Sequence, residues 1–238
     1  MRMLLFSIIM LAATTAGRSQ TAGEYFKRGL ARFEGNDPRG AITEFSHAIR
    51  LNHEYLDAYN KRGNAKLALH DYDGAIADYT TILEKDPGYV KAYYNRGIAK
   101  TELKNYNGAI IDYTKALGLL GSDPKVVEVY VNRGAVKIDQ QNFHSAIADF
   151  DKAIAINPTF AKAYLNRGMA KGLLHDYKGG IADLSKTIEI EPKNALAYLY
   201  RGIAKSESGQ KDSGCLDLRK AGELGAQGSA QMIKKYCD

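Results

Sequence analysis

Arginine and acidic side chains recur together along this sequence, and their spacing points to ionic contacts. Each arginine precedes a glycine, and an acidic residue follows sixteen positions after the arginine. A guanidinium presents a planar fork of donors that fits the two oxygens of a carboxylate. We therefore predict a ladder of structural ion pairs inside or between the units of the fold. The arginines are Arg28, Arg62, Arg96, Arg133, Arg167 and Arg201, and the acids are Glu44, Asp78, Asp112, Asp149, Asp183 and Asp217.

A lysine follows five of these glycines by three positions, and it allows two interpretations. The lysines either join the ion pairs or remain solvated surface charges. Arginines and lysines at these fixed positions make up eleven of the 33 basic residues. Little of the formal charge of +6 is then left for a stripe that could bind a nucleic acid, so we expect no such partner. The lysines are Lys66, Lys100, Lys137, Lys171 and Lys205.

Patterns for catalysis or metal binding are missing from the sequence. The histidines show no metal-ligand spacing with cysteine, aspartate or glutamate, and no nucleophile elbow, phosphate loop or zinc-protease motif occurs. His70 and His175 both precede an Asp-Tyr pair, which indicates a turn residue at a helix end rather than a ligand. We therefore predict a non-enzyme with no metal, no cofactor and no small-molecule substrate.

The elements that position these residues repeat at a nearly constant period. The glycines after the arginines are separated by 34, 34, 37, 34 and 34 residues. Such a period is the signature of a solenoid, in which each repeat contacts mainly its neighbours. The long interval contains three extra residues, roughly 121–123, which fall between two units, so we expect them to bend the stack without breaking it. The glycines are Gly29, Gly63, Gly97, Gly134, Gly168 and Gly202.

Each unit has the pattern of two amphipathic helices joined by a short turn. In the unit Leu56–Tyr89, apolar residues recur at helical spacing up to about Leu69, stop at His70 and resume from about Tyr72. Asp86 precedes a proline, which disfavours its helical conformation and ends the second helix. Small residues recur two and twelve positions after the glycines, where they let the two helix axes approach closely.

With this period, these glycine and alanine positions and a tyrosine four residues before each glycine, the chain resembles the tetratricopeptide repeat (TPR) family. The resemblance covers about Ala22–Gly228 and implies an all-α, right-handed α-solenoid of six helical hairpins. The last ten residues, 229–238, are expected to add a C-terminal capping helix. The predicted repeats are 22–55, 56–89, 90–126, 127–160, 161–194 and 195–228.

The resemblance also implies a binding surface, because in this family the first helices of successive hairpins line a concave face that holds peptide segments. Two residues before the glycine, three successive repeats carry asparagine, whose amide can donate to and accept from the backbone of an extended peptide. A mostly apolar row lies beside them. The alternative for both sets is packing against the next helix or capping of its backbone. The predicted groove residues are Tyr94, Asn95, Val131, Asn132, Leu165, Asn166, Met169, Leu199 and Tyr200.

The beginning of the chain points to a location outside the cytosol. Arg2, an apolar run from Met3 to Ala13 and small residues up to Ala16 have the three parts of a secretory signal peptide. We predict it as residues 1–16, with cleavage near 16–20. The run is shorter than the ~20 residues that span a bilayer, so we expect no membrane insertion. An N-terminal helix or a short uncleaved anchor is the alternative, and the predicted location is secreted or periplasmic.

Two cysteines lie close to the end of the chain. Cys215 stands where the other repeats have isoleucine, and Cys237 follows a tail, Ser229–Tyr236, with a helical pattern. In an oxidising compartment the two can form a disulfide that ties the tail to the last hairpin. Two free thiols in a cytosolic protein are the alternative.

From these features we predict a non-enzymatic interaction scaffold, exported from the cytosol, that binds an extended peptide segment of a partner protein in its concave groove. The expected partner is a protein or peptide, and the expected oligomeric state is a monomer. The alternative is a structural subunit of an envelope assembly that self-associates or docks end to end. Light scattering on the eluted protein separates the two, since only the subunit forms concentration-dependent oligomers.

Overall fold

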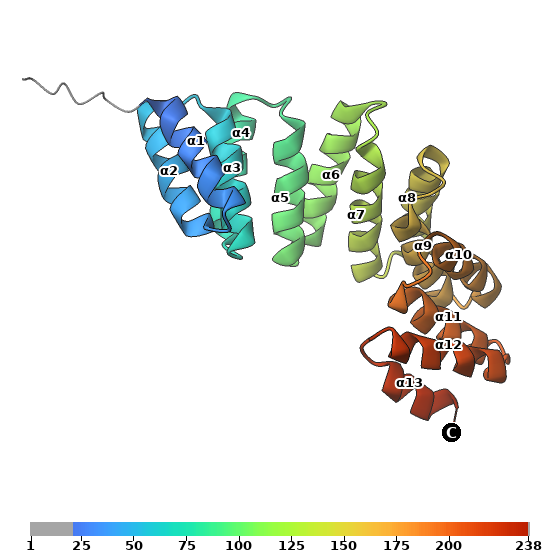
Figure 1. Cartoon of the computed structure of the whole chain (residues 1–238). Coiled ribbons are helices and arrows are strands. Elements are labelled where there is room, and N and C mark those ends of the chain that lie inside the picture. Colours follow the sequence, from blue (N-terminus) through green and yellow to red (C-terminus); the bar gives the residue numbers. More distant parts are fainter. Residues whose placement is uncertain (1–20, 238) are drawn as a thin grey trace, which may run out of the picture.

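The computed structural model describes residues 21–237, which form thirteen α-helices and no strand (Figure 1). Consecutive helices pack against each other, and the hairpins stack in chain order into a curved array. This confirms the predicted all-α solenoid with a capping helix, whereas the predicted signal peptide, 1–16, lies outside the described residues. The helices are α1 (Ala22–Glu34), α2 (Pro38–Leu51), α3 (Leu56–Ala68), α4 (Tyr72–Lys85), α5 (Val90–Glu102), α6 (Tyr106–Leu120), α7 (Val126–Asp139), α8 (Phe143–Ile156), α9 (Ala161–Leu173), α10 (Tyr177–Ile190), α11 (Ala195–Glu207), α12 (Lys211–Glu223) and α13 (Ser229–Tyr236).

In four of the six hairpins, the first, second, third and fifth, the turn combines a left-handed residue with a side-chain cap of the second helix. At His70 the backbone has a φ of 60°, and the next residue, Asp71, accepts a hydrogen bond from the backbone N–H of Gly74. Asparagine and aspartate caps of this kind satisfy N–H groups that a helix start leaves without partners. The imidazole Nδ1 of His70 lies 2.7 Å from the hydroxyl of Tyr72, so the side chain of this histidine forms a hydrogen bond within the turn. The left-handed residues of the first five hairpins are Asn36, His70, Lys104, Gln141 and His175.

The two helices of a hairpin meet where a glycine faces a large side chain. In the third hairpin the ring of Tyr113 packs on Gly97, and a Cβ at that glycine would lie only 2.7 Å from the ring. Tyr113 is 2% exposed, and this burial raises the pKa of its phenol to about 12. The last two hairpins depart from the aromatic pattern, because they carry leucine instead. The residues at this position are Phe45, Tyr79, Tyr113, Phe150, Leu184 and Leu218.

The stack continues across the three extra residues between the third and fourth hairpins. Helix α6 ends at Leu120, Gly121 turns with a φ of 56°, and α7 packs against α6 through a core that includes Tyr113 and Val129. The neighbouring first helices α5 and α7 contact each other less than α3 and α5, or α7 and α9, do. The insertion therefore loosens the inner face of the stack at this point, while α6 and α7 stay packed against each other.

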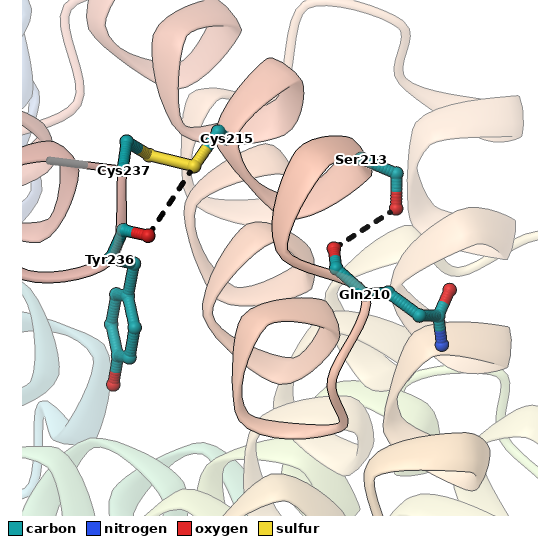
Figure 2. The surroundings of a disulfide bond; sticks show 5 residues. All are labelled: Gln210, Ser213, Cys215, Tyr236 and Cys237. Atoms are coloured by element: carbon teal, nitrogen blue, oxygen red, sulfur yellow. Dashed lines mark hydrogen bonds between the residues drawn. A yellow bond between two sulfur atoms is a disulfide. The ribbon is translucent and has the colours of Figure 1, made fainter.

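Helix α13 closes the C-terminal end of the stack. It packs against α11 and α12, where Met232 and Ile233 cover Leu218. A disulfide joins Cys215 of α12 to Cys237 just after α13, with the two Cα atoms 5.7 Å apart (Figure 2). Within residues 21–237 no helix is both long and apolar enough to cross a membrane.

Candidate functional site

The structure brings the predicted arginines and acids together inside each hairpin. In the third hairpin, Nε and Nη2 of Arg96 donate to the two carboxylate oxygens of Asp112 at 2.9 and 2.8 Å. Lys100 reaches the same carboxylate at 2.7 Å, although the Asp112 side chain is only 1% exposed. The predicted pairs Arg62–Asp78, Arg133–Asp149 and Arg167–Asp183 have the same fork, as does Arg201–Asp217.

The lysines join the ion pairs in all five hairpins that carry them. Lys66, Lys100, Lys137, Lys171 and Lys205 each lie within 2.9 Å of the acid of their own hairpin. Two cations therefore share each buried carboxylate. The repeat position alone did not decide whether the lysines pair with the acids, because a lysine stem can also lie along the surface with its ammonium in water.

In the arginines of the second to sixth hairpins, the remaining guanidinium nitrogen, Nη1, links neighbouring hairpins. Nη1 of Arg96 donates to the hydroxyl of Thr80, which lies on the second helix of the preceding hairpin, at 3.0 Å. This link was missed in the sequence, although a hydroxyl or acid sixteen residues before four of the arginines, and nineteen before Arg133, was a visible signal. The equivalent acceptors are Ser46 for Arg62, Thr114 for Arg133, Asp151 for Arg167 and Ser185 for Arg201.

We expect the last carboxylate of the ladder to make stability depend on acidity. Burial raises the pKa of Asp217, but hydrogen bonds from Arg201 and Lys205 outweigh it and hold that pKa below its ordinary value. Such a carboxyl stabilises the fold above its unfolded-state pKa of ~3.9, and this contribution is lost as pH falls through the folded-state pKa. In thermal melts from about pH 7 to pH 3, Asp217→Asn should therefore lower the melting temperature least at the acid end.

The exposed Asp212 of the same helix provides the control for that experiment. Asp212→Asn should leave the acid dependence of the melting temperature as it is in the unchanged chain. A constant difference between Asp217→Asn and the unchanged chain at every pH would contradict the assignment.

Two of the three predicted groove asparagines are already hydrogen-bonded within the stack. The amide nitrogen of Asn95 donates to Oδ1 of Asn64 at 3.0 Å, and that of Asn132 donates to the hydroxyl of Tyr94 at 2.9 Å. Both acceptors belong to the preceding first helix, so this row lies where consecutive first helices face each other.

Asn166 differs from the other two asparagines. The residues at the corresponding positions of its preceding first helix are Val131 and Ala135, which offer no polar side chain. Within the described part of the chain, Asn166 accordingly makes no side-chain hydrogen bond, and it is only partly buried. Of the three asparagines, its amide is the one open to a ligand.

Three predicted groove residues lie in the core and not on the surface. Val131, Leu165 and Leu199 are 1%, 8% and 7% exposed, and they pack between successive hairpins. The alternative interpretation, packing against the next helix, therefore describes them better. Their spacing in the sequence could not show that they are buried. A residue next to a groove position on the same helix already points toward the neighbouring helix, and both positions carry apolar residues. The predicted residues Met169 and Tyr200 stay partly exposed.

Around Asn132 the inner face contains a small polar cavity of about 180 Å³. Tyr94, Asn132, Glu128 and Lys162 contribute its polar groups, from α5, α7 and α9. It lies beside the place where the insertion loosens the contact between α5 and α7. An amide, a carboxylate and an ammonium within one cavity suit the alternating donors and acceptors of a peptide backbone.

Sequence profiles assign this architecture to a family. Two profiles, both described as tetratricopeptide repeat, match residues 60–124 and 127–160. The chain belongs to the tetratricopeptide repeat family. The resemblance drawn from the glycine period is thereby confirmed, and the hairpins are TPR hairpins.

Solved structures of other TPR proteins have the same fold. MamA is 28% identical over 75% of this chain and 96% of its own, with a TM-score of 0.64. YrrB, described as a TPR protein with an unusual peptide-binding site, is 21% identical over 80% of this chain and 97% of its own, with a TM-score of 0.65. PilF of Pseudomonas aeruginosa is 16% identical over 90% of this chain and 96% of its own, with a TM-score of 0.76. No curated protein matches the chain significantly.

The TPR fold supports the prediction of a protein–protein interaction scaffold. TPR proteins are typically non-enzymatic scaffolds of this kind. Among residues 21–237 no three histidine, cysteine or acidic side chains are grouped as metal ligands. Two sets of polar side chains recur at fixed repeat positions, the buried ladder and the inner row of asparagines. The ladder is saturated by its own contacts, so the inner face is the candidate site.

Proposed function

We propose that this chain is a non-enzymatic scaffold that binds an extended segment of a partner protein along its concave face. The observation that carries the proposal is the open amide of Asn166, which lies on the inner row between Asn132 and Tyr200. An asparagine amide can donate to one backbone carbonyl and accept from one N–H, so it fits an extended peptide. The polar cavity at Asn132 and Lys162 provides a second contact on the same row.

We further propose that the scaffold acts outside the cytosol, as a secreted or periplasmic monomer. The apolar leader, 1–16, and the cysteine pair at the other end support this location, because disulfides persist in oxidising compartments. The proposed partner is a protein or peptide. We do not propose a nucleic acid, because the ladder takes up much of the basic charge.

A structural subunit remains the second candidate, and one observation favours it. On the second helix α6, Ile111 and Leu119 are 61% and 46% exposed. They flank an open apolar hollow that also includes Thr114 and Gly118. Second helices do not line the inner row, so self-association through this patch would leave the groove free.

Asn166→Ala tests the proposed groove. Random peptides displayed on phage are selected on the mature chain, and the affinities of the selected peptides are measured by fluorescence polarisation. Losing two hydrogen bonds worth about 0.5–1.5 kcal/mol each should weaken binding by about 5- to 150-fold. Asn107→Ala, on the exposed side of α6, is the matched control and should bind as the unchanged chain does. Equal affinities for Asn166→Ala and the control would overturn the groove assignment.

A further inference from the structure

A further hollow on the inner face lies along the same row, between α9, α10 and α11. This α9–α11 cavity has a volume of about 480 Å³, within the ~300–1,000 Å³ typical of ligand pockets. Its walls are mostly apolar, and its polar groups sit among the exposed residues of the hairpin turn and the end of α11. The residues that carry the argument are Met169, Gly172, Leu184, Tyr200, Ile203 and Glu207.

The cavity exists because a side chain is missing at one repeat position. Four residues after the glycine, the first, second and fourth hairpins carry Phe33, Leu67 and Ile138, and each packs into the hairpin core. The fifth hairpin has Gly172 there, and a Cβ built on it would meet no atom within 4 Å. The space that an apolar side chain fills in other hairpins is therefore open in this one.

A second substitution enlarges the same space. The first four hairpins place an aromatic ring against the first helix, whereas the fifth has Leu184. In the third hairpin, where Thr101 is also small, the large ring of Tyr113 stays in place and its hydroxyl lies 3.4 Å from the threonine hydroxyl. In the fifth hairpin the missing side chain at Gly172 coincides with leucine on the second helix, and the cavity there is larger than those at α5 and α7. The sixth hairpin also has leucine, but its first helix keeps a side chain at this position, Ser206, which packs against Gly214.

The rim of the cavity carries one carboxylate, that of Glu207, near the imidazole of His175. Glu207 is exposed, and it accepts hydrogen bonds from Tyr236 and Lys235, which lower its pKa and keep it charged. Carboxylates recur at the same repeat position along this edge of the stack, five residues after the glycine, and all are exposed. They are Glu34, Glu102, Asp139 and Glu207.

We propose that the α9–α11 cavity receives a large apolar side chain, aromatic or leucine, from an extended partner segment, followed by a lysine or arginine. The apolar side chain occupies the space left at Gly172, against Met169 and Ile203. The stem of the basic residue lies along the apolar wall and its charged end meets Glu207, as long basic side chains commonly do. This inference rests on the proposed function, because it names the chemistry of the segment that the groove holds.

Gly172→Leu tests the proposal by filling the cavity from within. Leucine at this position restores what other hairpins carry and is a better helix former than glycine, so the fold should be retained. The peptides selected on the unchanged chain should pair an aromatic residue or leucine with a following lysine or arginine. Their affinity for Gly172→Leu should fall about tenfold or more, since one large apolar side chain is displaced.

Gly118→Leu is the matched control, because Gly118 also lies in a helix, its Cβ would also meet nothing within 4 Å, and it faces the outer side on α6. It should bind the peptides unchanged. Glu207→Gln, which leaves the cavity open, should weaken peptides with a basic residue more than peptides in which that residue is alanine.

The possible failures are distinguishable. Peptides that lose affinity with Asn166→Ala but bind Gly172→Leu unchanged would overturn the cavity assignment and leave the groove standing. Selection of no peptide, or of peptides indifferent to both substitutions, would overturn the cavity and the groove together. Circular dichroism and the melting temperature of each variant show whether its fold is retained.

Discussion

Replacing Asp112 by alanine is expected to lower the free energy of unfolding by about 3–5 kcal/mol. The carboxylate is almost fully buried and binds Arg96 through two hydrogen bonds and Lys100 through a third contact. Removing it leaves a guanidinium and an ammonium, 16% and 18% exposed, facing each other without their counter-ion. The destabilisation arises mainly from these two uncompensated charges.

Urea unfolding followed by circular dichroism measures the effect, and Asp151→Ala provides the control. Asp151 also binds an arginine, Arg167, but it is 54% exposed, and Arg167 keeps its fork with Asp183 when Asp151 is removed. An exposed pair contributes about 0–1 kcal/mol, so the control should change stability by no more than that. Similar losses for the two variants would show that burial does not set the strength of the ladder.

Reducing the disulfide is expected to lower stability by about 3 kcal/mol on the chain-entropy model, and the loss should be confined to the end of the stack. Cys215 and Cys237 are 22 residues apart, and the bond holds α13 over an apolar cluster that includes Leu199 and Leu218. In a solenoid each repeat contacts mainly its neighbours, so distant hairpins do not depend on this contact directly.

Hydrogen exchange with and without a thiol reductant locates the loss. Backbone amides of α12 and α13 should exchange faster after reduction, while those of α3 to α6 keep their protection. The double variant Cys215→Ser/Cys237→Ser is the control and should not respond to the reductant. A uniform loss of protection along the chain would contradict a local role for the bond.

The fold could be predicted because its signals are local and repeated six times. The helical pattern of Ser229–Tyr236 even predicted the bounds of α13. The partners of individual side chains were harder to predict, because they depend on which residues the neighbouring hairpin contributes. Asn95, Asn132 and Asn166 share one position, yet only the first two find polar groups on the preceding helix. The cavity at Gly172 was missed for a similar reason, since its hollow needs Leu184 from another helix.

The arginine that reaches back to the preceding hairpin gives the stack a direction. Nη1 of Arg96 needs a hydroxyl that precedes it in the chain, whereas its fork uses a carboxylate that follows it. Because N-terminal parts of a protein emerge first from the ribosome, each new hairpin meets an acceptor already fixed on a folded predecessor. Loss of a C-terminal hairpin therefore leaves these Nη1 contacts intact, whereas loss of an N-terminal hairpin removes the acceptor of the next arginine and exposes its Nη1 to water.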